Sequence, residues 1–347
     1  MKFIIVTDEH FHIEDYYQSS VSKVSGLLYE AMAAASSDDI EIVSPRKTQG
    51  ANKFIRFINR ILKFMEFQCT KIPSNTIVLF MSEAVVSVSI LLKSCNNNII
   101  LHGAELVAYP ELNTRSRKTF EERFSRFLVK LFSKRFKNVF FVSSWARDIW
   151  CIKFNFPKER CHIVGNPIFN SQIPIGRTKE KTVIYVGNNK PQKNVRRLCN
   201  AFLQSNLCTS GYTMRIIGKG HDDLIPEFGS SIEFIGQISD EALRKQYQKA
   251  EILCFPSLAE AFGMPALEGL AAGCNIVVSD RGALPEITRG MGFVCNPYST
   301  ASISRALEKA STTDRNQIEQ IEWISDQYSP ENYATRLVVK LKEANES

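Results

Sequence analysis

Two glutamates eight residues apart, Glu260 and Glu268, flank a turn that leads directly into a predicted helix. Between them, Phe262, Gly263 and Met264 can bring backbone N–H groups close to a ligand, because the glycine has no side chain to obstruct it. The proline that follows suits the first turn of a helix, where its missing N–H costs nothing. The unpaired N–H groups and the dipole at a helix start favour negative charge, so this turn predicts a phosphate site.

The two carboxylates cannot bind phosphate directly, but each can accept hydrogen bonds from sugar hydroxyls. A ligand that carries both kinds of group, such as a nucleotide sugar, therefore suits this stretch. The alternative is an acidic loop followed by an ordinary amphipathic helix. The surroundings favour the ligand site: a predicted strand at 252–255, the loop, a small-residue helix at 266–272 that Gly273 ends, and a strand at 275–279. Such units bind ligands at the carboxyl ends of their strands.

A second loop, Gly187 to Asn194, also follows a predicted strand and opens a predicted helix. Its two lysines, Lys190 and Lys193, can neutralise a diphosphate, a leaving group that gains charge as a glycosidic bond breaks. The alternative is a solvent-exposed basic turn. The Gly218-Lys219-Gly220 turn closes another strand, and here a simple tight turn and a ligand contact remain equally open.

Residues 256–273, PSLAEAFGMPALEGLAAG, resemble the signature of the retaining GT-B glycosyltransferases of glycosyltransferase family 4, the glycosyl transferases group 1. Residues 279–286, SDRGALPE, are similar to the strand and loop that follow it. The resemblance is dense in the C-terminal half and loose in the N-terminal half. It implies an α/β fold of GT-B architecture, with two Rossmann-like parallel-sheet domains facing across a cleft. It also implies transfer of a hexose from a nucleotide-diphosphate sugar, linked to UDP or GDP, with retention at the anomeric carbon.

The resemblance also assigns roles to the residues of both loops. Glu268 would hold the ribose hydroxyls of the donor, and Glu260 would hold the hydroxyls of its sugar. The diphosphate would bind a set of backbone and lysine groups: those of Phe262, Gly263, Met264, Lys190 and Lys193. The second of these lysines occupies the family's lysine position, whereas Asn188 stands where the family often has arginine, so Lys190 is inferred as the other cation.

The remaining donor contacts come from glycine turns after strands. Gly187 opens the loop that carries Lys190 and Lys193, and the turn from Gly236 to Ile238 follows another predicted strand. In similar enzymes the backbone of this turn binds the base. No Asp-x-Asp motif is present, so lysines and helix dipoles would replace a metal clamp, and no metal or cofactor besides the donor is expected.

The expected catalytic set is His102, Glu260 and Lys193. His102 ends a predicted strand and resembles the histidine that faces the donor sugar across the cleft, although a purely structural histidine is the alternative. His10 and His12 follow the first predicted strand and are weaker candidates for binding the acceptor. The family usually has glycines in that loop, and this chain has none there.

The expected activity transfers the hexose to a glycan or lipid-linked acceptor, in the synthesis of lipopolysaccharide, O-antigen or another cell-surface polysaccharide. Two other functions remain open. A sugar-nucleotide epimerase of GT-B architecture would act without an acceptor, and a non-catalytic membrane-associated GT-B scaffold would keep the fold without the chemistry. Intact Glu260, Glu268 and Lys193 argue against the scaffold. The base, the sugar, the acceptor and the linkage are not indicated by the residues.

The charge of the chain is uneven. Its 347 residues carry a formal net charge of +7, and the whole excess lies within residues 1–170. Basic positions concentrate in two predicted amphipathic helices, 53–66 and 118–137, which suit either an anionic membrane surface or a core helix with a solvated basic face. Nucleic acid is not expected, because neither aromatic–basic alternation nor zinc-finger spacing is present. Nine dispersed cysteines, no signal peptide and no long apolar run predict a cytoplasmic protein, with peripheral binding to the inner face of the plasma membrane as a hypothesis.

Strands alternate with helices along the whole chain, which indicates parallel sheets, and the length suits two domains. The expected organisation is an acceptor-side domain at 1–168, a linker at 169–181, a nucleotide-sugar-binding domain at 182–325, and a helix at 326–347 that crosses back to the first domain in the resembled family. Strands are expected at 3–7, 40–43, 76–80, 99–102, 139–142, 162–164, 182–187, 212–218, 232–235, 252–255 and 275–279. Helices are expected at 22–35, 53–66, 84–93, 118–136, 144–154, 194–204, 239–250, 266–272 and 328–344.

Overall fold

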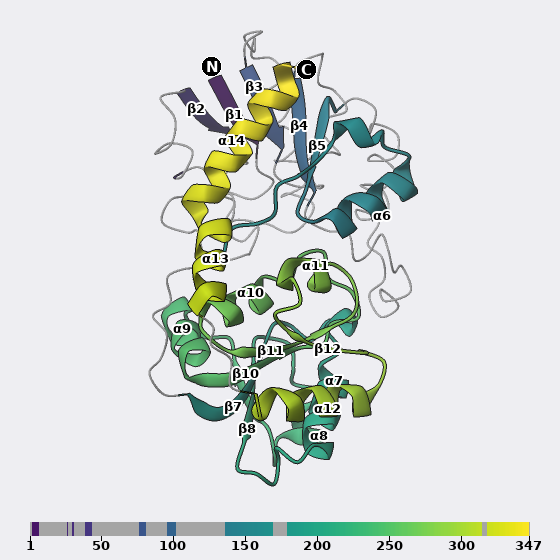
Figure 1. The fold of residues 1–347 in the computed structure, drawn as a ribbon, viewed down its shortest axis with the longest axis vertical. Helices are drawn as coiled ribbons and strands as arrows, with labels where there is room; N and C mark the ends of the chain where they lie inside the picture. The colour runs from purple at the N-terminus through teal and green to yellow at the C-terminus, as the bar shows by residue number, and fades with distance from the viewer. Residues whose placement is uncertain are drawn as a thin grey trace, which may run out of the picture. The chain divides into compact units, whose positions relative to one another are not determined.

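The structure, a computed structural model, describes residues 2–6, 26, 30, 39–43, 76–80, 96–101, 136–168, 179–313 and 318–346. These residues divide into two compact units. The first unit holds the described residues up to 167 together with 330–346, and the second unit holds those from 168 to 329. Each unit is built on its own sheet (Figure 1).

The sheet of the first unit has six parallel strands in the order β2-β1-β3-β4-β5-β6. The strands are β1 (Lys2–Val6), β2 (Asp39–Val43), β3 (Thr76–Phe80), β4 (Asn96–Leu101), β5 (Asn138–Phe141) and β6 (Cys161–Ile163). Parallel strands are covered on both faces, so they are rich in apolar residues, and three successive residues of β5 are fully buried. All six strands lie where the sequence predicts them, with ends that differ by a few residues.

Helix α6 (Ser144–Phe154) packs on β5 and β6 and has the bounds that the sequence predicts. Ser143 caps its start, because the Ser143 hydroxyl accepts a hydrogen bond from the backbone N–H of Ala146 at 3.0 Å. Asn155, in the left-handed conformation with a φ of 54°, ends the helix. A short 3₁₀ turn, η3 (Lys158–Arg160), then leads into β6.

The last helix of the chain, α14 (Pro330–Glu346), belongs to the first unit. Its C-terminal carbonyls accept hydrogen bonds from that unit: Lys137 Nζ lies 2.7 Å from the Asn345 carbonyl, and Asn138 Nδ2 lies 2.9 Å from the Ala344 carbonyl. These bonds satisfy groups that have no partner within a helix. The helix begins at Pro330, so residues 326–328, expected in the same helix, belong instead to α13 (Ile318–Tyr328) of the second unit.

The sheet of the second unit is also parallel and has the order β12-β11-β10-β7-β8-β9. Its strands are β7 (Glu180–Val186), β8 (Thr213–Ile217), β9 (Glu233–Gly236), β10 (Ala250–Phe255), β11 (Asn275–Ser279) and β12 (Phe293–Cys295). From β7 the chain builds outward through β8 and β9, and it then returns to the other side of β7 as β10. The strand order therefore reverses between β7 and β10, and open α/β sheets bind ligands at the carboxyl ends of strands at such a switch point.

Helices cover both faces of this sheet (Figure 1). They are α7 (Val195–Gln204), α8 (Ile225–Phe228), α9 (Asp240–Lys249), α10 (Met264–Ala271), α11 (Leu284–Thr288), α12 (Thr300–Ser311) and α13, together with the 3₁₀ turn η4 (Pro191–Lys193). Helix α10 lies so close to β10 that a Cβ atom at Gly269 would come within 2.6 Å of the Leu253 side chain. The small residues of α10 thus fix its start over the carboxyl end of β10.

The α/β fold with two parallel sheets is the one that the sequence predicts. The sequence does not predict α8, α11, β12, α12 or most of α13. Strand β7 begins at Glu180, inside the segment 169–181 that was expected to be linker. The helices expected at 53–66 and 84–93, and nearly all of those at 22–35 and 118–136, lie outside the described residues. Within the described part of the chain, no helix is both long and apolar enough to cross a membrane.

Candidate functional site

Two loops meet at the switch point: the β7 loop (residues 187–194) and the β10 loop (residues 256–263). The backbone N–H of Leu258 donates to the Gln192 carbonyl at 2.7 Å, which joins the loops directly. Asn194 adds a second connection, because its Nδ2 donates to the carbonyls of Pro256 at 3.0 Å and Pro297 at 2.7 Å. Asn194 has a left-handed backbone with a φ of 61°, which asparagine tolerates better than most residues.

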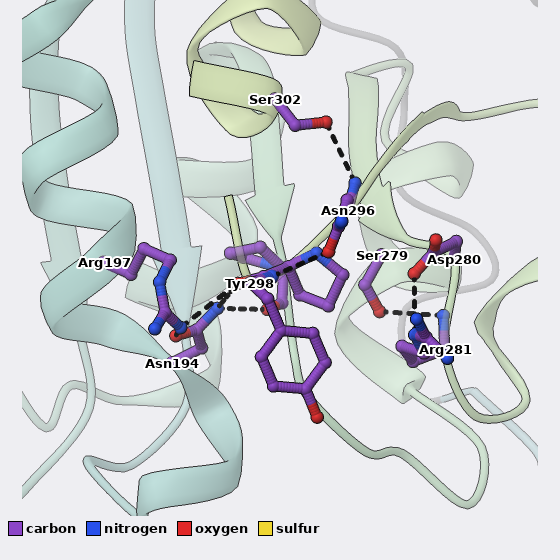
Figure 2. A network of polar contacts seen from close by, with 10 residues as sticks. Asn194, Arg197, Ser279, Asp280, Arg281, Asn296, Tyr298 and Ser302 are labelled. Carbon is purple, nitrogen blue, oxygen red and sulfur yellow. Dashed lines mark hydrogen bonds and ion pairs between the residues drawn. The ribbon is translucent and has the colours of Figure 1, made fainter. Parts of the chain in front are cut away.

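Arg197 supports this connection from the first turn of α7. Its guanidinium donates to the Asn194 side-chain oxygen and to the Pro297 carbonyl at 3.1 Å. Figure 2 shows the Asn194 and Arg197 side chains side by side, with dashed lines to the backbone just before Tyr298. The β7 loop is therefore fastened to two other loops before any ligand binds.

Lys193 and Glu260, which the resemblance assigns to different parts of the donor, form an ion pair. Lys193 Nζ lies 2.7 Å from Glu260 Oε2 and 2.9 Å from Oε1. The exposed fractions of the two side chains are 18% and 9%, so the pair is largely removed from water. The ammonium group also lies 5.2 Å from the centroid of the Phe255 ring, a cation–π contact. A buried charge is stable only when it is paired, so each group of this pair depends on the other.

The loop between β11 and α11 fixes the backbone of Glu260. The N–H of Ala283 donates to the Glu260 carbonyl at 2.8 Å. Gly282 packs so tightly beside it that a Cβ atom would come within 2.5 Å of the Glu260 carbonyl oxygen, and its φ of 66° also favours glycine. The SDRGALPE segment that follows the signature therefore has a direct structural task, which is to hold this carboxylate in place.

Glu268 projects from α10 and is held by a tyrosine of α9. The Tyr247 hydroxyl donates to Glu268 Oε2 at 2.8 Å, and both residues are buried. Burial raises the pKa of Tyr247 well above its ordinary value, and the Glu268 charge raises it further. The hydroxyl therefore remains a donor at neutral pH, and the orientation of the carboxylate is set before a ligand arrives.

The start of α10 lies between the two carboxylates and presents backbone groups, as predicted. Gly263 precedes the helix with a φ of 97°, and a Cβ atom there would meet the Leu284 side chain at 2.6 Å. Gly263, at the cap position, has no side chain to cap this start, and no acidic residue occupies the first turn of the helix. The positive end of the helix dipole is thus left for an anion. The buried Phe262 side chain packs edge-on against Tyr328, with ring centroids 5.8 Å apart.

Three glycines interlock where β7, β8 and β9 end. The N–H of Gly187 donates to the Ile217 carbonyl at 2.9 Å, and the N–H of Gly218 donates to the Gly236 carbonyl at 2.8 Å. A Cβ atom at Gly218 would lie 1.9 Å from the Gly187 carbonyl oxygen, so only glycine permits this approach. The tight-turn interpretation of Gly218 accounts for this glycine, and the turn from Gly236 to Ile238 follows β9 as expected.

The structure thus gathers most of the predicted donor-binding residues at the carboxyl edge of one sheet. Lys190 is exposed on the β7 loop, and its side chain contacts no charged group among the described residues. His102, His10 and His12 lie outside the described residues, as do nearly all of the two basic helices. The expected contribution of His102, the cleft between the domains and the role of each site residue stay predictions.

Supporting residues that were not predicted from the sequence include Asn194, Arg197 and Tyr247. Tyr247 carried a usable signal, because it is the one aromatic in an otherwise polar helical stretch, and a single large ring there indicates a buried contact. Ser239 caps the same helix, because its hydroxyl accepts a hydrogen bond from the Ala242 N–H at 3.2 Å.

The chain is similar to several known proteins. The O-antigen chain mannosyltransferase RfbU of Salmonella typhimurium is 26% identical over 222 residues, which cover 61% of this chain and 60% of that protein. The chain therefore spans less than two thirds of the length of this relative. The solved structure of sucrose-phosphate synthase from Thermosynechococcus elongatus matches with a TM-score of 0.79 at 14% identity, covering 100% of both chains. The Anabaena protein HepE, solved with UDP and glucose, matches with a TM-score of 0.67 at 13% identity, covering 98% of this chain and 99% of that one.

These structural matches show the fold, which is the two-sheet α/β architecture called GT-B. Residues 169–322 match the family model described as glycosyl transferases group 1. The matched range contains both loops, both glutamates and the uncapped start of α10. Over residues 169–322 the chain is therefore similar to the glycosyl transferases group 1 family.

Proposed function

We propose that this protein transfers a hexose from a nucleotide-diphosphate sugar to a glycan or lipid-linked acceptor, in the synthesis of O-antigen, lipopolysaccharide or another cell-surface polysaccharide. The observation that carries the proposal is the Lys193–Glu260 pair beside the uncapped start of α10, at the switch point of the sheet. A diphosphate needs positive groups and free N–H donors, and a sugar needs acceptors for its hydroxyls. This small region offers both.

The ion pair suggests how the leaving group is stabilised. A lysine ammonium has three N–H donors, and contact with both oxygens of Glu260 engages two of them. The third remains for a phosphate oxygen. As the glycosidic bond breaks, negative charge grows on the diphosphate next to a cation already held in place, which lowers the barrier without reorganisation. Glu260 would meanwhile accept hydrogen bonds from the sugar, and Glu268 from the ribose.

Retention at the anomeric carbon and independence from metal are the finer parts of the proposal. In the proposed reaction the acceptor hydroxyl attacks from the face that the diphosphate leaves, and the diphosphate takes the proton of that hydroxyl. The lysine and the helix dipole would supply the positive charge that a metal ion supplies elsewhere. NMR of the first-formed product would show the same anomeric configuration as the donor, and EDTA would leave the rate unchanged; an inverted product or loss of rate would contradict these parts.

The proposal predicts a specific effect of removing the ion pair. The Lys193→Met/Glu260→Gln double variant removes both charges together, so no unpaired charge is left buried. Loss of one charged hydrogen bond should weaken nucleoside-diphosphate binding by at least about tenfold, and sugar transfer should be abolished. Isothermal titration calorimetry with UDP and GDP measures the first effect. A panel of UDP- and GDP-hexoses with membrane-extracted acceptor measures the second.

Lys245 offers a matched control, because it also pairs with a glutamate, Glu241, at 2.7 Å but is exposed on α9. Lys245→Met should change neither binding nor transfer. Transfer by the double variant at the wild-type rate would overturn the proposal. Release of an epimer without any acceptor would favour the epimerase, and a wild-type protein that neither binds nor consumes any donor would favour the scaffold.

Peripheral binding at the inner face of the plasma membrane is a further part of the proposal, and it rests on charge. The whole excess of +7 lies in residues 1–170, and Lys53, Arg56, Arg60 and Lys63 repeat at helical spacing. Anionic lipids attract each such residue by about 1 kcal/mol. Reversing these four charges to glutamate should abolish co-sedimentation with liposomes that contain phosphatidylglycerol. Undiminished co-sedimentation would remove the membrane from the proposal.

A further inference from the structure

His221 is a buried histidine that neither the signature nor the expected mechanism uses. It follows the turn after β8, and only 5% of its surface is exposed. Its Nε2 lies 2.9 Å from the Gly187 carbonyl oxygen. A carbonyl can only accept, so Nε2 must carry the hydrogen, and Nδ1 is then an acceptor. Nδ1 is buried and has no hydrogen-bond partner within the part of the chain that the structure describes. His221 therefore makes its hydrogen bond to the β7 loop through Nε2 alone.

Tyr185 holds the next carbonyl of the same loop. Its hydroxyl donates to the Asn188 carbonyl at 2.9 Å. Its ring meets the His221 ring edge-on, with centroids 6.0 Å apart and planes at 89°, so the two side chains support each other. Burial raises the pKa of Tyr185 well above its ordinary value, so the hydroxyl stays protonated and continues to donate. Two neighbouring carbonyls are thus drawn toward the buried side of the loop.

The direction of each carbonyl also fixes the direction of the N–H group in the same peptide bond. In a trans peptide the C=O and the N–H point in opposite directions, and the described residues contain no cis bond. The Gly187 carbonyl belongs to the same peptide group as the N–H of Asn188, and the Asn188 carbonyl belongs to the same peptide group as the N–H of Asn189. Both N–H groups therefore point away from His221 and Tyr185. Neither has a hydrogen-bond partner among the described residues.

The side chains of these asparagines are already engaged. Asn188 Oδ1 accepts a hydrogen bond from the Lys190 N–H at 3.2 Å, and Asn189 Nδ2 donates to the Asp223 carboxylate. Their backbone N–H groups stay available to a ligand beside the Asn188 side-chain Nδ2, and successive free N–H groups form anion-binding concavities. Lys190 and Lys193 lie in the same loop, although Glu260 pairs with the second of them.

We propose that His221 is a positioning residue that, together with Tyr185, turns the N–H groups of Asn188 and Asn189 outward as a hydrogen-bonding pair for a phosphate of the donor. This inference rests on the proposed function and deepens it. Asn188 stands where the resembled family often has arginine, and the two backbone groups would take over the task of that missing side chain. They add donors to the diphosphate that do not depend on either lysine.

The test compares two substitutions that differ only in which ring nitrogen they imitate. In His221→Gln the amide nitrogen reaches the position of Nε2 and can still donate to the Gly187 carbonyl. In His221→Asn the amide reaches only the position of Nδ1. Calorimetry measures binding of UDP and GDP and of the matching nucleosides, uridine and guanosine. The nucleosides lack phosphate, so they report any general distortion of the site.

We expect His221→Gln to bind the diphosphate as wild type does and His221→Asn to bind it about tenfold more weakly, while nucleoside binding stays the same in all three proteins. Tyr185→Phe, which keeps the ring and removes only the hydroxyl, should act as His221→Asn does and carries the test if that variant does not fold. Equal diphosphate binding by all variants, or equal losses for diphosphate and nucleoside, would overturn the inference while the proposed function stands. A wild-type protein that binds neither diphosphate would overturn both.

Discussion

Glu268 is oriented by the protein itself, since Tyr247 donates to its Oε2 at 2.8 Å from a neighbouring helix. In its proposed role as the acceptor of ribose hydroxyls, Glu268 gains from this arrangement, because its rotamer is fixed before binding and less entropy is lost. Tyr247 itself is completely buried, and its hydroxyl reaches nothing but this site among the contacts that the structure describes. At the scale of single residues, the tyrosine is therefore as much a part of the candidate site as the glutamate.

Tyr247→Phe should accordingly weaken nucleoside binding without affecting binding of inorganic pyrophosphate. The variant keeps the packing of the ring and removes one hydrogen bond to a charged group, a change of about 1.5–3 kcal/mol in the free energy of unfolding. Loss of orientation at Glu268 should lower the affinity for uridine or guanosine in the same protein. Thermal denaturation and calorimetry with pyrophosphate and nucleoside measure these effects separately.

Tyr212 provides the matched control, because its hydroxyl donates to Glu251 at 2.6 Å near the amino ends of β8 and β10. Tyr212→Phe removes a tyrosine–glutamate hydrogen bond from the same sheet, at the edge opposite the candidate site. It should lower the melting temperature and leave nucleoside binding unchanged. Equal nucleoside affinity for Tyr247→Phe and wild type would show that the tyrosine has only a structural role.

At the scale of elements, the sequence predicts the strands well because parallel strands are covered on both faces. Their apolar runs stand out whatever surrounds them, and the runs at 76–80 and 275–279 match β3 and β11 residue for residue. The short helices α8 and α11 have four and five residues, too few to show a helical period. Helix α12 is different: Ser299 before it and Ile303 and Leu307 at helical spacing are signals that the sequence reading did not use.

The candidate site was predicted from signature residues, whereas its internal connections were not. Lys193 and Glu260 lie 67 positions apart in the chain, so their contact depends on β7 and β10 being neighbours. The alternation of strands and helices predicts a parallel sheet, but it does not give the order of the strands. The contact between Gly282 and the Glu260 backbone depends on the same order. Residue types can therefore predict which groups serve a ligand, and the strand order determines which of them pair with each other.

At the scale of the whole molecule, the chain completes its first unit with its last helix. Tyr333, Leu337 and Leu341 of α14 are fully buried, and the end of the helix accepts hydrogen bonds from Lys137 and Asn138. Each buried apolar side chain of this size contributes about 2 kcal/mol. Three of them together approach the whole net stability of a typical domain, about 5–15 kcal/mol. The first unit should therefore not remain folded without α14.

A chain that ends at Ser329 tests whether the first unit needs α14 to fold. It keeps both loops, both glutamates and all of α13, so we expect it to bind UDP or GDP as the full chain does. It should lose amide-hydrogen protection in β1 to β6, because α14 is gone, and keep protection in β7 to β12. Hydrogen-exchange mass spectrometry with and without nucleotide measures both outcomes in one experiment. Full protection of β1 to β6 in the shortened chain would show that the first unit folds without its last helix. Loss of nucleotide binding together with protection in both sheets would show that nucleotide binding requires residues 330–346 although the second unit stays folded without them.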